Sequence, residues 1–228
     1  MLTRAQEKLI VSLATSKGRE ESGLCLVEGR KVIETAGKAI EWTFSRSDTP
    51  RFDKLLDVKT AQEIAAVARI PKWNESDIFD SDTVVLLDGV QDPGNVGAIL
   101  RLCLGFHATL VLVECADPAS PKVIRSSVGA LFAVPWIEWQ RKDVVKKLNQ
   151  YDRSVYRLEK KNEGGHITIP AEIKKLNKKA IIIAGSEGGG IQLQVEGISV
   201  AIEHDNALES LNVGHALAIV LSMRYSLK

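Results

Sequence analysis

Six short apolar segments, separated by stretches long enough for a helix, dominate the chain from residue 83 onward. They lie at residues 84–87, 109–113, 134–138, 154–158, 180–184 and 199–203. Short segments that are apolar at successive positions are typical of parallel strands covered on both faces. The residues between and after them favour helices around 95–104, 122–130, 141–149, 189–196 and 212–226. This alternation predicts an α/β fold with a doubly wound, mostly parallel sheet, in which a ligand binds beyond the carboxyl ends of the strands.

The first part of the chain has a different pattern and predicts a separate small α/β module. Helical spacing of apolar residues covers residues 3–14, and strand-like segments at 24–27 and 40–44 flank a helix predicted at 30–37. Thr60, with Glu63 three residues later, forms a capping-box pattern that predicts a helix to about Ala68. The segment that follows is polar, acidic and without periodicity. We therefore expect a domain at residues 1–75, a linker at 76–82 and a larger domain at 83–228.

The composition excludes several classes of protein. The chain has 228 residues, of which 45% are hydrophobic and 26% charged, so it is neither disordered nor a disulfide-stapled miniprotein. Cys25, Cys103 and Cys115 have no paired spacing, which favours a reduced, cytoplasmic compartment and argues against a zinc ribbon. The apolar segments are too short to span a bilayer, and the first residues lack the pattern of a signal peptide. We expect His204 and His215 to be ordinary packed or polar histidines, with no metal bound.

The net charge of +1 hides a basic segment at residues 141–179, which has 12 Lys and Arg against 5 Asp and Glu. Such a segment can attract a polyanion. These basic residues also flank apolar positions on predicted amphipathic helices, so a solvated helix face explains them equally well.

The first of three polar loops follows the segment at 84–87. Its Asp-Pro-Gly sequence at 92–94 favours a turn, because proline fixes φ and glycine accepts positive φ. Asn95 stands where the N-cap of the next helix is expected, and Gly97 allows the close approach of a ligand or partner. Arg101 is the only charged side chain in an otherwise apolar run. A guanidinium in such surroundings indicates a phosphate or carboxylate partner.

The second and third loops follow the segments at 180–184 and 199–203. Residues 185–190 contain four glycines around Glu187, a composition that lets the backbone line a ligand cavity. They match neither the Walker loop nor the dinucleotide-binding fingerprint, so this loop lacks the signatures expected of ATP- and NAD-dependent enzymes. In the third loop, Ser210 and Asn212 can each cap the final helix or face the same crevice.

The three loops together resemble the motifs of the SpoU (TrmH-like) RNA ribose 2′-O-methyltransferases of the SPOUT superfamily, over residues 82–228. The matching motifs, in chain order, are Asn95-x-Gly97-x-x-x-Arg101, Gly185-x-Glu187-Gly188 and Ser210-Leu211-Asn212-Val213. A weaker match at residues 25–34 resembles the start of the L30e-like RNA-binding domain that many members acting on 23S rRNA carry.

This resemblance implies a C-terminal trefoil knot that binds S-adenosylmethionine through the chain around Gly185, Ile202 and Leu211. It also implies a homodimer with the active site near the subunit interface and an RNA substrate, with rRNA favoured over tRNA by the N-terminal module. The residues 202–206 depart from the proline-containing sequence that family members often show there. The alternative is therefore an RNA-binding protein on the same fold that no longer methylates.

The resemblance also implies roles for five catalytic-site residues. In the family the residue that matches Arg101 is proposed to activate the hydroxyl. Because a guanidinium does not normally deprotonate, we expect Arg101 to hold the phosphate beside the target ribose and to stabilise alkoxide charge. Asn95 and Asn212 position Arg101 and the ribose. Ser210 donates or accepts a hydrogen bond nearby, and Glu187 orients this polar group.

Overall fold

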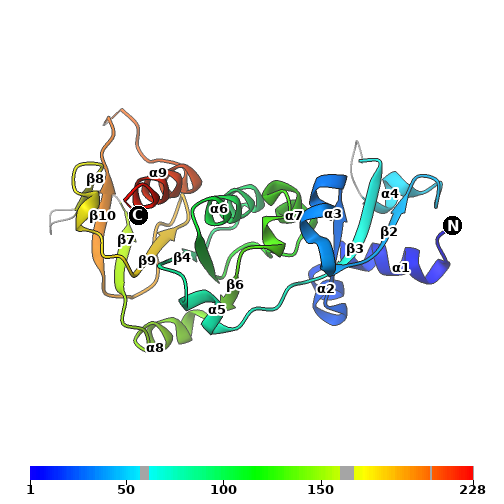
Figure 1. Ribbon diagram of the computed structural model, residues 1–228, viewed down its shortest axis with the longest axis horizontal. Helices are drawn as coiled ribbons and strands as arrows, with labels where there is room; N and C mark the ends of the chain where they lie inside the picture. Colours follow the sequence, from blue (N-terminus) through cyan, green and yellow to red (C-terminus); the bar gives the residue numbers. More distant parts are fainter. Residues whose placement is uncertain (57–61, 160–166, 206, 228) are drawn as a thin grey trace.

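The structure, a computed structural model, describes residues 1–56, 62–159, 167–205 and 207–227. The molecule is elongated, with a three-stranded sheet near the N-terminus and a seven-stranded sheet in the remainder (Figure 1). Within the described ranges, no helix has both the length and the apolar character needed to cross a membrane.

The N-terminal module is an antiparallel sheet with helices packed on it. The strand order is β1-β3-β2, with β1 (Leu24–Glu28), β2 (Ile40–Ser45) and β3 (Ile64–Arg69). The helices are α1 (Arg4–Leu13), α2 (Ser16–Ser22), α3 (Arg30–Ala36), the 3₁₀ helix η1 (Gly37–Ala39) and α4 (Phe52–Leu56). One face of the sheet buries a cluster that includes Ile10, Phe44 and Phe52. The predicted small α/β module is therefore present, with its first helix and first two strands where expected.

The helix predicted from Thr60 to Ala68 is wrong, because residues 64–69 form the central strand of this sheet. Thr60 itself lies outside the described residues. Alanines favour a helix in isolation, yet Ala65, Ala66 and Ala68 are fully buried between β1 and β2. Tertiary pairing on both sides overrides the local propensity.

The large sheet has the strand order β6-β5-β4-β9-β7-β10-β8, and every neighbouring pair is parallel. Its strands are β4 (Thr83–Asp88), β5 (Ala108–Val113), β6 (Trp136–Trp139), β7 (Ser154–Leu158), β8 (Ile167–Ile169), β9 (Ala180–Gly185) and β10 (Ile198–Ile202). The predicted α/β fold is confirmed, and all six predicted strands are present, five of them with shifted ends. The three-residue strand β8 was not predicted, because it is too short to show a pattern.

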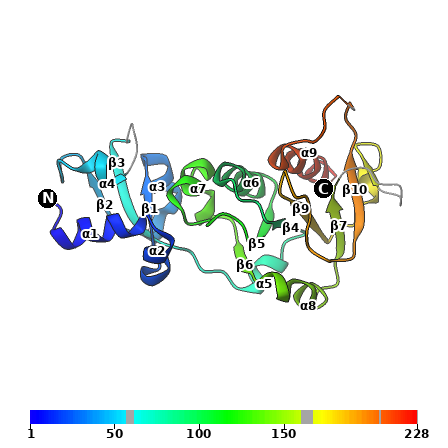
Figure 2. The same cartoon turned by 180° about the vertical axis from the view of Figure 1, so that it is seen from behind.

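Helices cover both faces of the large sheet (Figures 1 and 2). One face carries α6 (Pro93–Gly105), α7 (Pro121–Ser127), η2 (Ala130–Phe132) and α9 (Val213–Tyr225). The other carries α5 (Glu75–Phe79), η3 (Arg141–Asp143) and α8 (Val144–Leu148), and η4 (Ile173–Lys175) follows β8. Along β4, Val85 and Leu87 join the core under α6, whereas Val84 and Leu86 join the core under α5. This alternation explains why the strand is apolar at successive positions.

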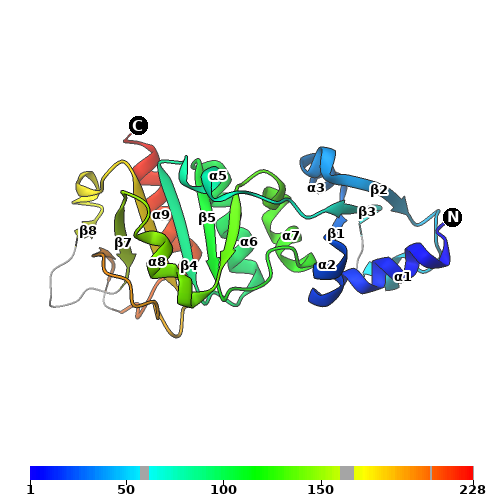
Figure 3. The ribbon, with the colours of Figure 1, turned by 90° about the horizontal axis from the view of Figure 1, so that it is seen from below.

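The two modules share buried contacts, and the segment expected as a linker is partly structured. Helix α5 overlaps that segment from residue 76 to 79, and its Ile78 and Phe79 are buried in the large domain. Cys25 and Val27 of the small sheet belong to the same core as Ile124 of α7. Figure 3 shows α7 between the two sheets. The domain boundaries, the L30e-like character of the first module and the trefoil knot remain predictions.

Candidate active site

Helix α6 begins three residues earlier than the sequence motif indicated. The side chain of Asp92 accepts a hydrogen bond from the Asn95 backbone N–H at 2.9 Å, and Pro93 occupies the first helical position. Asp92 is therefore the N-cap, and the prediction of Asn95 as the cap is wrong. Asn95 lies in the first turn, where its side-chain amide is available to other loops.

Gly97 serves the packing of two helices. A Cβ atom at this position would lie 1.9 Å from the Ser126 hydroxyl oxygen and 2.8 Å from the Ser127 backbone nitrogen. Gly97 thus allows helix α7 to approach helix α6 closely. This packing holds the first loop against the rest of the domain.

Three predicted site residues from three different loops form one hydrogen-bonded group. Asn95 donates its side-chain N–H to Glu187 Oε1 at 3.1 Å, and Asn212 donates to Asn95 Oδ1 at 3.0 Å. Asn212 also donates to Glu187 Oε1. The structure therefore brings these residues together across sequence separations of 92 and 117 positions.

Asn212 has a second contact that fixes its orientation. Its Oδ1 accepts from the backbone N–H groups of Gly214 at 2.9 Å and His215 at 3.3 Å, which makes it the N-cap of α9. Because the oxygen is committed to the helix, the amide nitrogen must face Asn95 and Glu187. Of Ser210 and Asn212, which the sequence offered as caps for the final helix, Asn212 is the one that caps α9.

The glycine-rich loop after β9 is a closed turn. The Gly190 backbone N–H donates to the Ser186 carbonyl at 2.8 Å, and a Cβ atom at Gly185 would lie 2.0 Å from the Gly190 carbonyl group. Only glycine allows this approach at Gly185. A cavity of about 240 Å³ adjoins the turn, lined by Gly89, Val90, Gln91, Asp92, Asn95, Ser186, Glu187, Gly188 and Val213.

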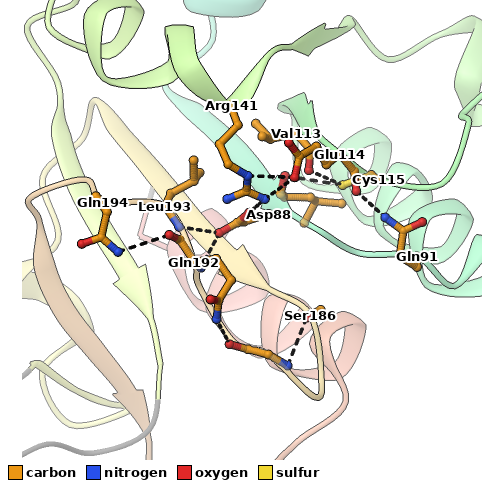
Figure 4. A network of polar contacts seen from close by, with 12 residues as sticks. Asp88, Gln91, Val113, Glu114, Cys115, Arg141, Ser186, Gln192, Leu193 and Gln194 are labelled. Carbon is orange, nitrogen blue, oxygen red and sulfur yellow. Dashed lines mark hydrogen bonds and ion pairs between the residues drawn. The ribbon is translucent and has the colours of Figure 1, made fainter.

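The helix predicted at residues 189–196 is wrong, and the cause is a buried carboxylate that the sequence analysis missed. Asp88, at the end of β4, accepts from the backbone N–H groups of Gln192 at 2.5 Å and Leu193 at 2.8 Å (Figure 4). Those N–H groups are therefore unavailable to a helix. The available signal was an acidic residue ending a strand that is otherwise apolar, directly before Gly89.

The three predicted cofactor-binding residues lie at the ends of elements on the same side of the sheet. Gly185 ends β9, Ile202 ends β10, and half-buried Leu211 lies directly before Asn212. Because β9 and β10 are parallel and separated only by β7, their carboxyl ends lie at one edge. Their contact with a cofactor remains a prediction.

Arg101 and Ser210 are exposed, and neither side chain forms a hydrogen bond or ion pair with a residue in the described part of the chain. Arg101 lies on α6, six residues beyond Asn95. The structure thus places its charge where an external phosphate can reach it, and does not bring it into the group formed by Asn95, Glu187 and Asn212. Among the described residues, no group of three or more His, Cys, Asp and Glu side chains could hold a metal.

Comparison with known proteins places this geometry in a family. The model of the SpoU rRNA methylase family matches residues 82–222, more than half of the chain. The 23S rRNA (guanosine(2553)-2′-O)-methyltransferase RlmP of Bacillus subtilis is 26% identical over 92% of this chain and 91% of its own length.

Solved structures share the whole architecture. The structure described as a putative RNA methyltransferase of the TrmH family from Porphyromonas gingivalis is 27% identical, with 100% of both chains covered and a TM-score of 0.84. An AdoMet-bound rRNA methyltransferase from Sinorhizobium meliloti shares the fold with a TM-score of 0.83, at 22% identity over 100% of this chain and 96% of its own. Methyl transfer to RNA and S-adenosylmethionine as cofactor, both implied by the three motifs, are confirmed at the level of the family. This chain belongs to the SpoU rRNA methylase family.

Proposed function

We propose that this protein transfers the methyl group of S-adenosylmethionine to a ribose 2′-hydroxyl of 23S rRNA. The observation that carries the proposal is the group formed by Asn95, Glu187 and Asn212, in which the three motif loops meet beside a cavity. The name of the Bacillus subtilis relative specifies this reaction and RNA, and that relative aligns along 92% of the chain, which favours rRNA over tRNA.

The cavity suits S-adenosylmethionine by its chemistry. Val90 and Val213 supply apolar surface, Gly188 leaves backbone groups accessible, and the Glu187 carboxylate favours a cationic sulfonium. Gly185, Ile202 and Leu211 do not line this cavity. They would hold the part of the cofactor that extends beyond it, through their backbone groups. When bound, S-adenosylmethionine supplies an already activated methyl group, so the protein needs to align the acceptor oxygen and help remove its proton.

The residues of the chain divide this task. The guanidinium of Arg101 binds the phosphate next to the target ribose and stabilises developing alkoxide charge. Asn95 and Asn212 orient the ribose, and Glu187 fixes both amides by accepting from them. Ser210 donates or accepts a hydrogen bond with the bound RNA or cofactor.

We further propose that the protein acts as a cytoplasmic homodimer, with the N-terminal module contributing to RNA binding. Leu104 on α6, with Ile219 and Tyr225 on α9, are 45%, 36% and 43% exposed. The two helices pack together, and the Phe106 and Tyr225 rings lie 5.8 Å apart. Exposed apolar side chains on adjoining helices favour burial against a second subunit.

The decisive experiment maps 2′-O-methyl groups in RNA from cells with and without the gene, alongside calorimetry with S-adenosylmethionine. The loss of one methyl group in 23S rRNA supports the proposal. If the methyl group is lost from tRNA alone, the substrate is tRNA and not 23S rRNA. Unchanged methylation, together with no cofactor binding by the folded protein, favours a non-catalytic RNA-binding protein.

A further inference from the structure

Asp88 contacts the glycine-rich loop at both of its ends. Its backbone is paired in register with Gly185, where the loop leaves β9. Its carboxylate accepts from the N–H groups of Gln192 and Leu193, where the loop ends. Leu193 is buried in the core under α5, so the far end of the loop is also fixed by packing. One residue thus sets both ends of the segment that carries Glu187.

The charge of Asp88 is balanced by Arg141 (Figure 4). The Asp88 side chain is 0% exposed, and its Oδ1 accepts from Arg141 Nη2 at 2.8 Å. A buried carboxylate is tolerated only when it is paired and hydrogen-bonded. Oδ2 takes the two backbone N–H groups and Oδ1 takes the guanidinium, so both oxygens are committed.

Arg141 is shared between a buried and an exposed carboxylate. Its Nε donates to Glu114 Oε2 at 2.8 Å, and the Glu114 side chain is 59% exposed. Hydrogen bonds with Glu114 and Asp88 raise the pKa of Arg141 above its ordinary value, which keeps the guanidinium charged. Of the two carboxylates, only that of Asp88 also binds the loop after β9.

We propose that Asp88, together with Arg141, is a positioning residue that holds the loop from Gly185 to Leu193 in the conformation that binds S-adenosylmethionine and presents Glu187 to Asn95 and Asn212. This inference rests on the proposed function. Asp88 does not line the cavity; it acts through Ser186, Glu187 and Gly188, which do.

The test compares Asp88→Asn with Glu114→Gln, which removes the exposed carboxylate from the same guanidinium. An amide at position 88 cannot accept from both the loop and Arg141, so the loop loses charge-assisted hydrogen bonds. We expect Asp88→Asn to weaken S-adenosylmethionine binding in calorimetry by about 10- to 100-fold, and Glu114→Gln by less than about two-fold. The KM for RNA should change far less than the KM for the cofactor.

Hydrogen exchange provides a readout that does not depend on activity. In the parent protein the amides of Gln192 and Leu193 should be protected. In Asp88→Asn they should exchange faster, while the amides of β5 keep their protection. Uniform loss of protection in both places would show a general structural role and overturn the proposal, as would cofactor affinity within about two-fold of the parent.

If Asp88→Asn does not fold, two variants of Arg141 test the proposal. Arg141→Gln should weaken cofactor binding, and Arg141→Lys, which retains the charge, should recover part of the loss; equal affinities for the two variants would overturn the proposal. If the parent protein does not bind S-adenosylmethionine, the proposed function fails, and the exchange of Gln192 and Leu193 alone decides the role of Asp88.

Discussion

The N-terminal module and the methylase domain each bury one charged side chain, but of opposite sign. Among the described residues these are Arg19, 5% exposed, and Asp88, 1% exposed. Arg19 donates from Nε to Asp117 Oδ2 at 2.9 Å and from Nη1 to the Leu13 carbonyl at 2.7 Å. Asp88 accepts from a loop of its own domain. The cation therefore joins two modules, whereas the anion shapes one site.

This difference shows what a buried charge does in each region. Asp117 also accepts from the Ala119 backbone N–H at 2.8 Å, directly before α7, so Arg19 ties the N-terminal module to the loop that leads into that helix. Loss of a buried charge that is hydrogen-bonded removes charge-assisted hydrogen bonds, which costs more than the loss of an exposed pair. Loss of Arg19 should therefore affect the attachment of the module, and loss of Asp88 should affect cofactor binding.

The largest effect is expected from an exposed charge, Arg101. Replacing it by alanine should lower methyl transfer by about 100-fold or more without lowering the melting temperature, because it stabilises transition-state charge and has no partner among the described residues. Methylation assays with radiolabelled cofactor check this. Lys146→Ala removes an exposed cation from α8 and should retain activity. Full activity of Arg101→Ala would refute its assignment.

The second largest effect is expected from removing Arg19, whose pair with Asp117 links the two modules. Arg19→Met removes charge-assisted hydrogen bonds and leaves an Asp117 side chain that is 32% exposed. It should lower the free energy of unfolding by about 2 kcal/mol and reduce activity on RNA, with cofactor affinity unchanged. Arg69→Met removes a pair with Glu41 at 2.9 Å within the N-terminal module, where the two side chains are 66% and 36% exposed, so it should cost less than about 0.5 kcal/mol. Denaturant unfolding and calorimetry measure both quantities. A loss of cofactor affinity in Arg19→Met would contradict the separation of roles.

Asn212→Asp should have an intermediate effect that is confined to the site. Aspartate remains a good N-cap for α9, so stability should change by less than about 0.5 kcal/mol. It cannot donate to Glu187 and places a second carboxylate beside it, so we expect methyl transfer to fall by about 10-fold. Thermal unfolding and single-turnover methylation separate the two effects. A large loss of stability with normal turnover would assign Asn212 to capping alone.

The smallest effect concerns the thiols. Burial raises the pKa of Cys25 and of Cys103 from 9.0 to about 12. Both should therefore stay protonated and resist iodoacetamide at pH 8, and react at normal rates in denaturant. Since the unfolded thiols lose their protons first, their contribution to stability is present below pH 9 and is lost as the pH rises toward 12. Rapid labelling of the folded protein at either cysteine would contradict this burial.

The sequence predicted which loops meet more accurately than it predicted several of the elements around them. The three motif loops identified Asn95, Glu187 and Asn212, which do meet, because residues at the carboxyl ends of strands in a parallel sheet gather at one edge. The same reasoning did not find Asp88, since a single acidic residue after an apolar strand also suits an ordinary turn. Its function depends on two backbone N–H groups more than 100 residues away.

By itself the sequence determined six of the seven strands of the large sheet, because successive apolar residues are typical of strands covered on both faces of a parallel sheet. Tertiary structure alone decided that residues 64–69 pair as a central strand and that residues 189–196 do not form a helix. In both segments the local preference for a helix is weaker than the hydrogen bonds made with distant residues. Backbone groups taken by β1, β2 or Asp88 cannot also complete a helix, and no local pattern records where those partners lie.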